Sequence, residues 1–207
     1  MFDLKTDELK LKILDCAGGP ASFNAEMTCL GYEVVSCDPI YQFRAKEIAQ
    51  RIQDTYQTVV NGVRDNKDNY VWKNVKSPEE MGQIRMSAMH KFLQDLPKGT
   101  EEKRYITGEL PILALPNENF DLALCSHFLF TYSDLLSLEF HIKSIIELCR
   151  VASNVRVFPL LNVSGEKSIL LPSVINELKR QGCRLEIRKV PYEFQKGGNQ
   201  MLQVWKE

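Results

Sequence analysis

The chain has 207 residues, of which 44% are hydrophobic, and a formal net charge of -1 from 26 basic and 27 acidic side chains. This size allows one sizeable core, so we expect a single domain over residues 1–207. The balanced charge argues against a general nucleic-acid or membrane surface and leaves only a local basic patch open. No apolar stretch approaches the roughly 20 residues that span a bilayer.

The first ten residues, MFDLKTDELK, are charged and lack the apolar core of a signal peptide. No two cysteines have C-x-x-C spacing, and several stand in apolar runs, which predicts buried thiols in a reducing cytosol. Histidine and acidic clusters are also missing, so we expect a cytoplasmic protein without a metal. The six cysteines are at positions 16, 29, 37, 125, 149 and 183.

Apolar runs that predict strands alternate with amphipathic helical patterns along most of the chain. This alternation predicts a Rossmann-like α/β fold, with a mostly parallel seven-stranded sheet and helices on both faces. The short loop QKGGN makes the last two strands an antiparallel hairpin. The expected strands are 11–16, 32–38, 104–110, 121–126, 154–161, 183–194 and 200–207, and the expected helices are 20–31, 43–63, 77–96, 133–152 and 168–182.

Several of these helices carry start signals. Ser77, Pro78 and Glu80 form a capping-box pattern, and Ser133 or Asp134 is the expected cap of the helix that follows the fourth strand. Pro172 is expected in the first turn of the last helix.

Residues 62–100 interrupt the alternation, because a minimal unit needs only one helix and short loops between its second and third strands. We interpret this segment as a helical insertion rich in methionine, which offers adaptable apolar surface. It is either a lid or substrate cap over the carboxyl edge of the sheet, or a helix packed elsewhere or a dimer contact.

Small and acidic residues stand where the first two strands end. Ala17, Gly18 and Gly19 leave the backbone bare before a helix, whose free N–H groups favour a negative group such as a carboxylate. A tight turn without a ligand explains the same residues. Asp38 can accept hydrogen bonds from ribose hydroxyls or cap the next helix. Asp15 can fix the loop amides or face an ammonium group.

Three stretches together carry a family resemblance: ILDCAGGPA, VVSCDP and YITGELPILALPNENFDLALCSHFLF. The chain resembles the class I S-adenosylmethionine-dependent methyltransferases, and the last stretch resembles small-molecule enzymes of the ubiquinone/menaquinone-biosynthesis type. The resemblance covers the sheet elements but not residues 62–100. The family usually has glycine where this chain has Ala17.

The resemblance implies S-adenosylmethionine as the cofactor and gives each strand end a role. Ala17, Gly18 and Gly19 would lie under its methionine portion, with Asp15 near the ammonium group. Asp38 would hold the ribose, Pro39 and Ile40 would flank the adenine, and Glu109 and Leu110 would lie at the adenine edge. Ser126 and His127 would lie near the methyl group.

Candidates for proton handling are few. His127 follows the fourth strand and is either a base or substrate hydrogen-bond donor, or a structural residue. His141 lies inside a predicted helix and is expected to be structural.

The first interpretation is therefore a methyltransferase acting on an O, N or C nucleophile of a small molecule. The alternatives are a methyltransferase acting on protein or RNA, a non-catalytic S-adenosylmethionine-binding module, and a nicotinamide-dependent oxidoreductase. The glycine spacing and the terminal hairpin argue against the oxidoreductase, and the balanced charge argues against RNA. The methyl acceptor and the oligomeric state do not follow from the sequence.

Overall fold

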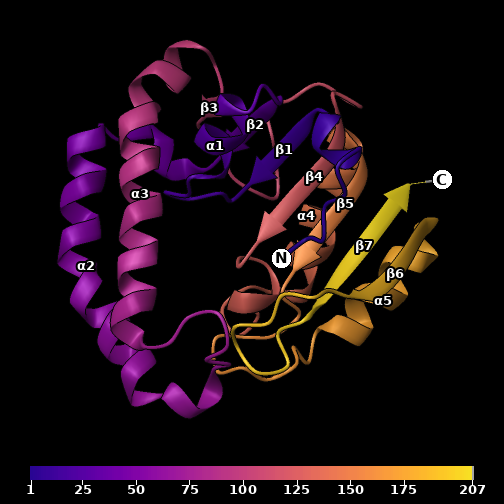
Figure 1. The fold of residues 1–207 in the computed structure, drawn as a ribbon. Helices are drawn as coiled ribbons and strands as arrows, with labels where there is room; N and C mark the ends of the chain where they lie inside the picture. Colours follow the sequence, from indigo (N-terminus) through magenta and orange to yellow (C-terminus); the bar gives the residue numbers. More distant parts are fainter. Residues whose placement is uncertain (207) are drawn as a thin grey trace.

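A seven-stranded sheet with the order β3-β2-β1-β4-β5-β7-β6 forms the centre of the computed structural model, which describes residues 1–206 (Figure 1). The first five strands are parallel, and β7 pairs antiparallel with both β5 and β6. The expected fold class is confirmed. The strands are β1 Ile13–Cys16, β2 Val34–Cys37, β3 Tyr105–Ile106, β4 Phe120–Ser126, β5 Ala152–Phe158, β6 Cys183–Lys189 and β7 Gln200–Lys206.

Side chains alternate across the sheet and build a separate core on each face. Leu14 belongs to the cluster that includes side chains of α4 and α5, whereas Ile13 joins Phe2 and Met27 of α1 on the opposite face. Asp15 therefore shares the face that α1 covers. The helices are α1 Phe23–Cys29, α2 Ala45–Asp65, α3 Pro78–Glu101, α4 Leu138–Val151 and α5 Leu171–Arg180.

The insertion consists mainly of α3, which packs antiparallel against the preceding helix α2, and the two form a helical hairpin (Figure 1). Ser77 caps α3 as predicted, because its Oγ accepts a hydrogen bond from the Glu80 N–H at 3.1 Å. The Glu80 carboxylate, however, accepts from Lys76 N–H, so the reciprocal half of the capping box is absent. The helix also continues through Pro97 to Glu101, beyond its predicted end.

The turn of this hairpin is joined to the loop between β6 and β7, a contact that we call the strap. Val71 N–H donates to the Phe194 carbonyl at 2.7 Å, and Lys196 N–H donates to the Asn69 carbonyl at 2.9 Å. The rings of Tyr70, Trp72 and Phe194 pack with centroid distances of 4.9, 5.7 and 5.9 Å. Because β6 ends at this loop and α2 follows β2, the hairpin reaches across the carboxyl edge of the sheet.

Two boundaries differ from the sequence prediction. Neither Ser133 nor Asp134 caps α4; Ser137 does, with its Oγ accepting from Phe140 N–H at 3.1 Å. The N–H groups of residues 135 and 136 bond to the Tyr132 carbonyl, and these turns delay the helix. The third strand is only two residues long, because residues 109 and 112 bridge across a turn. Pro172 lies in the first turn of α5, as predicted.

The sequence also led to expectations about the cysteines, membrane-spanning helices and metal sites. Five of the six cysteines are buried, and Cys29 is exposed. Within residues 1–206, no helix has the length and apolarity needed to cross a bilayer. The same part of the chain has no group of three His, Cys, Asp or Glu side chains suited to a metal ion.

Phe92 should carry much of the stability of the hairpin. Its ring is fully buried between Tyr41 and Tyr105, at centroid distances of 5.7 and 5.4 Å. Phe92→Ala should lower the free energy of unfolding by about 3–5 kcal/mol in urea titrations followed by circular dichroism. Ile84→Ala, on the same helix but 51% exposed, should change it by about 0.5 kcal/mol or less. Equal effects of the two variants would contradict this packing.

Candidate active site

The backbone after β1 folds over two buried carboxylates at the carboxyl edge of the sheet. Gly19 N–H donates to Asp38 Oδ2 at 2.9 Å, and the Tyr41 hydroxyl donates to the Gly19 carbonyl at 2.9 Å. Ala17 and Gly19 both adopt left-handed conformations, with φ of 56° and 57°. Ala17 thus has the conformation that glycine adopts at no steric cost, at the position where the resembling family usually has glycine.

Gly18 is required by what lies beneath it. A Cβ atom at this position would lie 2.3 Å from Asp15 Oδ2 and 3.1 Å from the Tyr41 hydroxyl. The bare backbone therefore has an internal cause: the Asp15 carboxylate occupies the space that a side chain would fill.

Asp38 ends β2 and is 8% exposed. Its Oδ1 accepts from Ile40 N–H at 2.9 Å and caps the short 3-10 helix Pro39–Gln42, while its Oδ2 holds Gly19. The capping interpretation is confirmed, yet each carboxylate oxygen can accept two hydrogen bonds and keeps one position for a ligand.

Asp15 is 7% exposed, and its Oδ2 accepts from the Ser36 hydroxyl at 3.0 Å. Burial, together with the negative charge of Asp38, raises the pKa of Asp15 to about 6, and the hydrogen bond from Ser36 opposes this rise. The environment of Asp15 therefore disfavours its negative charge, and a cation bound beside it would offset this cost.

The four residues expected around an adenine follow the neighbouring strands β2 and β3. Pro39 is half-buried, and half-buried Ile40 packs against the cluster that contains Phe92. Glu109 is exposed, whereas the Leu110 side chain is 6% exposed and belongs to the core. Leu110 can therefore meet a ligand mainly through its backbone.

Ser126 is the last residue of β4, the strand next to β1, and His127 follows it. His127 has a φ of 52°, an unusual conformation for a side chain of this size. Its Nδ1 lies 2.8 Å from Ser126 Oγ, which in turn donates to the Met1 sulfur at 3.7 Å. Either group can donate in the Ser126–His127 contact, depending on the tautomer, and a neutral imidazole keeps one nitrogen with a lone pair.

The His127 imidazole keeps an exposed surface while protein surrounds much of it, and its ring packs edge-on against Phe158 at 5.6 Å. Burial, followed by the positive charges of Arg85 and the Met1 amino group, lowers the pKa of His127 to about 4. At neutral pH this ring is uncharged. His141, in contrast, is fully buried, with its nitrogens 2.8 and 3.0 Å from the carbonyls of Ser137 and Leu129, and is structural as expected.

Arg85 on α3 is a residue that the sequence prediction missed. After burial, its positive charge is the next cause of the lowered pKa of His127, and it opposes the burial-driven rise in the pKa of Tyr70 and of Tyr192. It makes no ion pair within residues 1–206. The sequence held one indication of this unpaired charge, because none of the positions three or four residues away from Arg85 is acidic.

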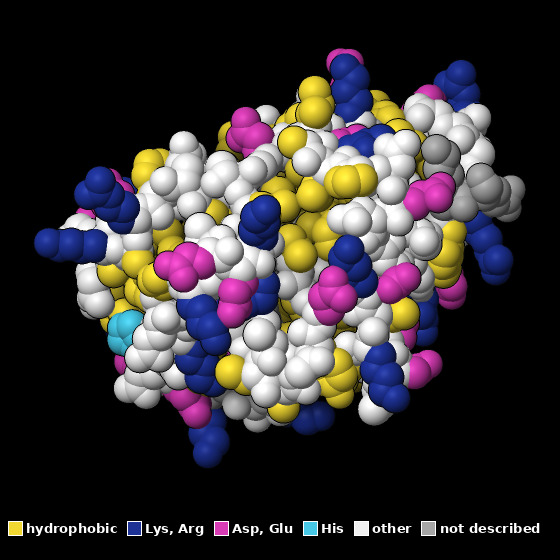
Figure 2. Space-filling model, turned by 90° about the horizontal axis from the view of Figure 1, so that it is seen from above, with side chains coloured by type: hydrophobic (Ala, Val, Ile, Leu, Met, Phe, Trp, Pro, Cys, Tyr) yellow, Lys and Arg dark blue, Asp and Glu magenta, His cyan; other side chains and the backbone are white. Residues whose placement is uncertain are grey.

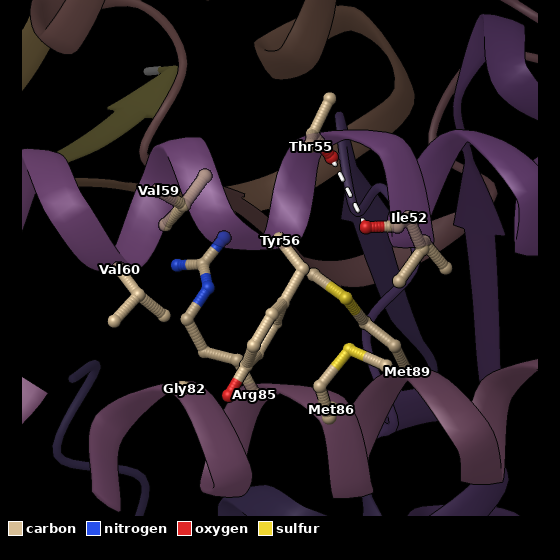
Figure 3. A pocket seen from close by; sticks show the side chains of 9 residues that line it. All are labelled: Ile52, Thr55, Tyr56, Val59, Val60, Gly82, Arg85, Met86 and Met89. Atoms are coloured by element: carbon tan, nitrogen blue, oxygen red, sulfur yellow. Dashed lines mark hydrogen bonds between the residues drawn. The ribbon is translucent and has the colours of Figure 1, made fainter. Parts of the chain in front are cut away.

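A small cavity lies inside the hairpin, away from these strand ends (Figure 3). Its volume is about 60 Å³, too small for a nucleoside, since ligand sites typically have several hundred Å³. Tyr56 reaches across it from α2 towards Gly82, where a Cβ would lie 2.8 Å from the Tyr56 hydroxyl. This cavity is a packing gap between two helices. The residues that line it are Ile52, Thr55, Tyr56, Val59, Val60, Gly82, Arg85, Met86 and Met89.

Comparison with known structures defines the class of fold. The chain is similar to a TehB-like SAM-dependent methyltransferase from Corynebacterium glutamicum, with 14% identity, a TM-score of 0.50, and coverage of 96% of this chain and 80% of that one. It also aligns with a SAM-dependent methyltransferase from Methanosarcina mazei at 11% identity and a TM-score of 0.49, covering 99% and 98% of the two chains. The likeness to the Corynebacterium glutamicum structure shows that the fold is that of the class I methyltransferases.

Sequence comparison defines the family. The chain is 36% identical over 203 residues to the uncharacterized protein MJ0045 of Methanocaldococcus jannaschii, covering 98% of this chain and 89% of that protein. It belongs to the family of MJ0045. No protein-family model matches the sequence.

Replacing Asp15 by asparagine should stabilise the protein at neutral pH. The pKa of Asp15 is about 6 in the folded protein and 3.8 in the unfolded chain. The contribution of Asp15 to stability is therefore fully present only below pH 3.8 and is lost as the pH rises through 6. In urea titrations, Asp15→Asn should exceed wild type by up to about 3 kcal/mol at pH 7.5 and by much less at pH 4.5. A variant that is less stable than wild type at pH 7.5 would show that the ionised Asp15 carboxylate does not lower the free energy of unfolding.

Proposed function

We propose that this protein is an S-adenosylmethionine-dependent methyltransferase, folded as one domain over residues 1–207, that methylates an O, N or C nucleophile of a small molecule. The observation that carries the proposal is the pair of buried carboxylates at the carboxyl ends of adjacent strands: Asp38 holds Gly19 N–H, and Asp15, which accepts from Ser36 and not from the loop amides, lies directly beneath Gly18. Ligands of open α/β sheets bind at this edge.

The residues present fit the cofactor. Asp38 keeps acceptor positions for two ribose hydroxyls, and Asp15 offers a buried negative charge to the ammonium group of the methionine portion. Pro39, Ile40 and the backbone at Leu110 would flank the adenine, with Glu109 at its edge. When bound, the cofactor would supply an electrophilic methyl group on a sulfonium.

Two observations support a small acceptor, of the kind that the quinone-biosynthesis resemblance suggests. The strap joins the α2–α3 hairpin to the β6–β7 loop, which restricts access by a macromolecule to the edge between them. Figure 2 shows basic and acidic side chains interspersed on the face seen from above, which does not favour a polyanion there. We therefore assign the hairpin the role of a substrate cap.

His127 is the candidate base. In the tautomer whose Nε2 is unprotonated, its neutral ring can take a proton from the attacking group, and the contact with Ser126 orients the ring. Arg85, whose positive charge also lowers the pKa of His127, would favour an acceptor that carries negative charge.

The cofactor assignment predicts specific binding. S-adenosylhomocysteine should bind in titration calorimetry and raise the melting temperature, and NAD should do neither. Asp38→Asn should weaken this binding about tenfold or more, because it disrupts a buried acceptor of several hydrogen bonds. The matched control is Asp121→Asn, since Asp121 also accepts a backbone N–H, from Lys12 at 2.8 Å, but at the opposite edge of the sheet. The proposal fails if wild type gives no heat with the nucleoside.

The state of His127 can be measured without knowing the acceptor. In carbon-detected NMR titrations, the signal that disappears in His127→Gln should titrate near pH 4, so the ring is neutral at pH 7. Arg85→Gln should raise that pKa by removing a nearby positive charge, whereas Arg64→Gln, which removes a cation paired with Glu79, should leave it unchanged. A His127 pKa above 6 would contradict the assigned environment.

A further inference from the structure

A continuous series of hydrogen bonds leads from Arg104 through Asn24 and Ser36 to Asp15. Arg104 Nη1 donates to Asn24 Oδ1 at 2.6 Å, and Asn24 Nδ2 donates to Ser36 Oγ at 3.1 Å. The Ser36 hydroxyl donates to Asp15 Oδ2 at 3.0 Å. Asn24 and Ser36 are each 1% exposed, so water cannot replace these partners.

Arg104 determines which group donates and which accepts in each hydrogen bond of this series. A guanidinium can only donate, so the oxygen of the Asn24 amide must face Arg104. The amide nitrogen is then turned towards the carbonyls of Val34 and Arg104, at 3.1 and 2.9 Å, and towards Ser36. Because Ser36 Oγ receives a hydrogen bond from Asn24, its own proton is left for Asp15.

The outer end of the series is held by the inserted hairpin. Asp95 on α3 pairs with Arg104 through two hydrogen bonds of 2.7 and 2.8 Å, and it also accepts from the Tyr105 hydroxyl at 2.9 Å. The series therefore extends from α3 through β3, α1 and β2 to the end of β1.

We propose that Arg104, Asn24 and Ser36 are positioning residues that hold the Asp15 carboxylate in a fixed orientation beneath Gly18. They thereby set the affinity of the site for the ammonium end of its cofactor. This inference rests on the proposed function. It also makes that affinity pH-dependent, since an ammonium is attracted only when Asp15 is ionised.

One charged group around Asp15 acts against its ionisation: Asp38, just after β2, repels its negative charge. The thiols of Cys16 and Cys125 and the hydroxyl of Tyr41 also lie near Asp15, but their raised pKa values keep them protonated and uncharged at neutral pH. Ser36 gives the one side-chain hydrogen bond that favours the charged form. Removing it should raise the pKa of Asp15 above 6.

Ser36→Ala tests the inference, with Ser144→Ala as the matched control. Ser144 is also fully buried, but its hydroxyl has no hydrogen-bond partner in the described chain. In calorimetry with S-adenosylhomocysteine, Ser36→Ala should weaken binding about tenfold at pH 7 and recover towards wild type at pH 8.5. Ser144→Ala should follow wild type at both pH values.

Asn24→Asp tests the direction of the bonds while keeping the shape of the side chain. A carboxylate at position 24 can only accept, so it would draw the Ser36 proton away from Asp15 and shift the binding profile to higher pH, as Ser36→Ala does. If both variants bind like wild type at pH 7, the positioning role is wrong.

A second readout needs no cofactor. The Asp15 carboxyl carbon, titrated by NMR in the free protein, should show a higher pKa in both variants than in wild type. An unchanged pKa overturns the inference even if cofactor binding is intact. Absence of nucleoside binding to wild type, with the pKa raised as expected, would overturn the proposed function alone.

Discussion

Two carboxylates buried side by side at the ends of adjacent strands are the constraint on which the rest of the site depends. Asp15 and Asp38 repel each other in a region of low polarity, so each needs donors from the protein. Asp38 is satisfied by two backbone N–H groups and Asp15 by a serine hydroxyl. Burial raises the pKa of both carboxyl groups, but two backbone N–H groups oppose the rise at Asp38 and only one hydroxyl opposes it at Asp15, so Asp15 gains most from an added cation.

The local backbone follows from the same constraint. Gly18 must lack a side chain because Asp15 lies directly beneath it, and Ala17 adopts a left-handed conformation so that the next amides turn towards Asp38. Such a conformation costs a residue with a Cβ about 1 kcal/mol. The strain at Ala17 and at His127 occurs at the carboxyl ends of neighbouring strands, where strain is commonly associated with function.

The sequence was sufficient to predict the alternating strands and helices, the terminal hairpin and the insertion, because each depends on local periodicity. The α4 cap was assigned wrongly because Ser133, Asp134 and Ser137 are all suitable caps, and only the preceding turn selects Ser137. Asn24 and Arg104 could not be connected to each other or to Asp15 beforehand, because they are 80 residues apart and only the pairing of β2 with β3 brings them into contact. Long-range contacts of this kind leave no periodic signal.

The strap also has a kinetic consequence. Separating the hairpin from the β6–β7 loop breaks two backbone hydrogen bonds and two ring contacts, whereas each helix can remain intact. On the proposed function, ligand exchange that required this separation would be limited by a local opening step, and the residence time of a bound molecule would depend on residues 69–72 and 194–196, which lie apart from the proposed site.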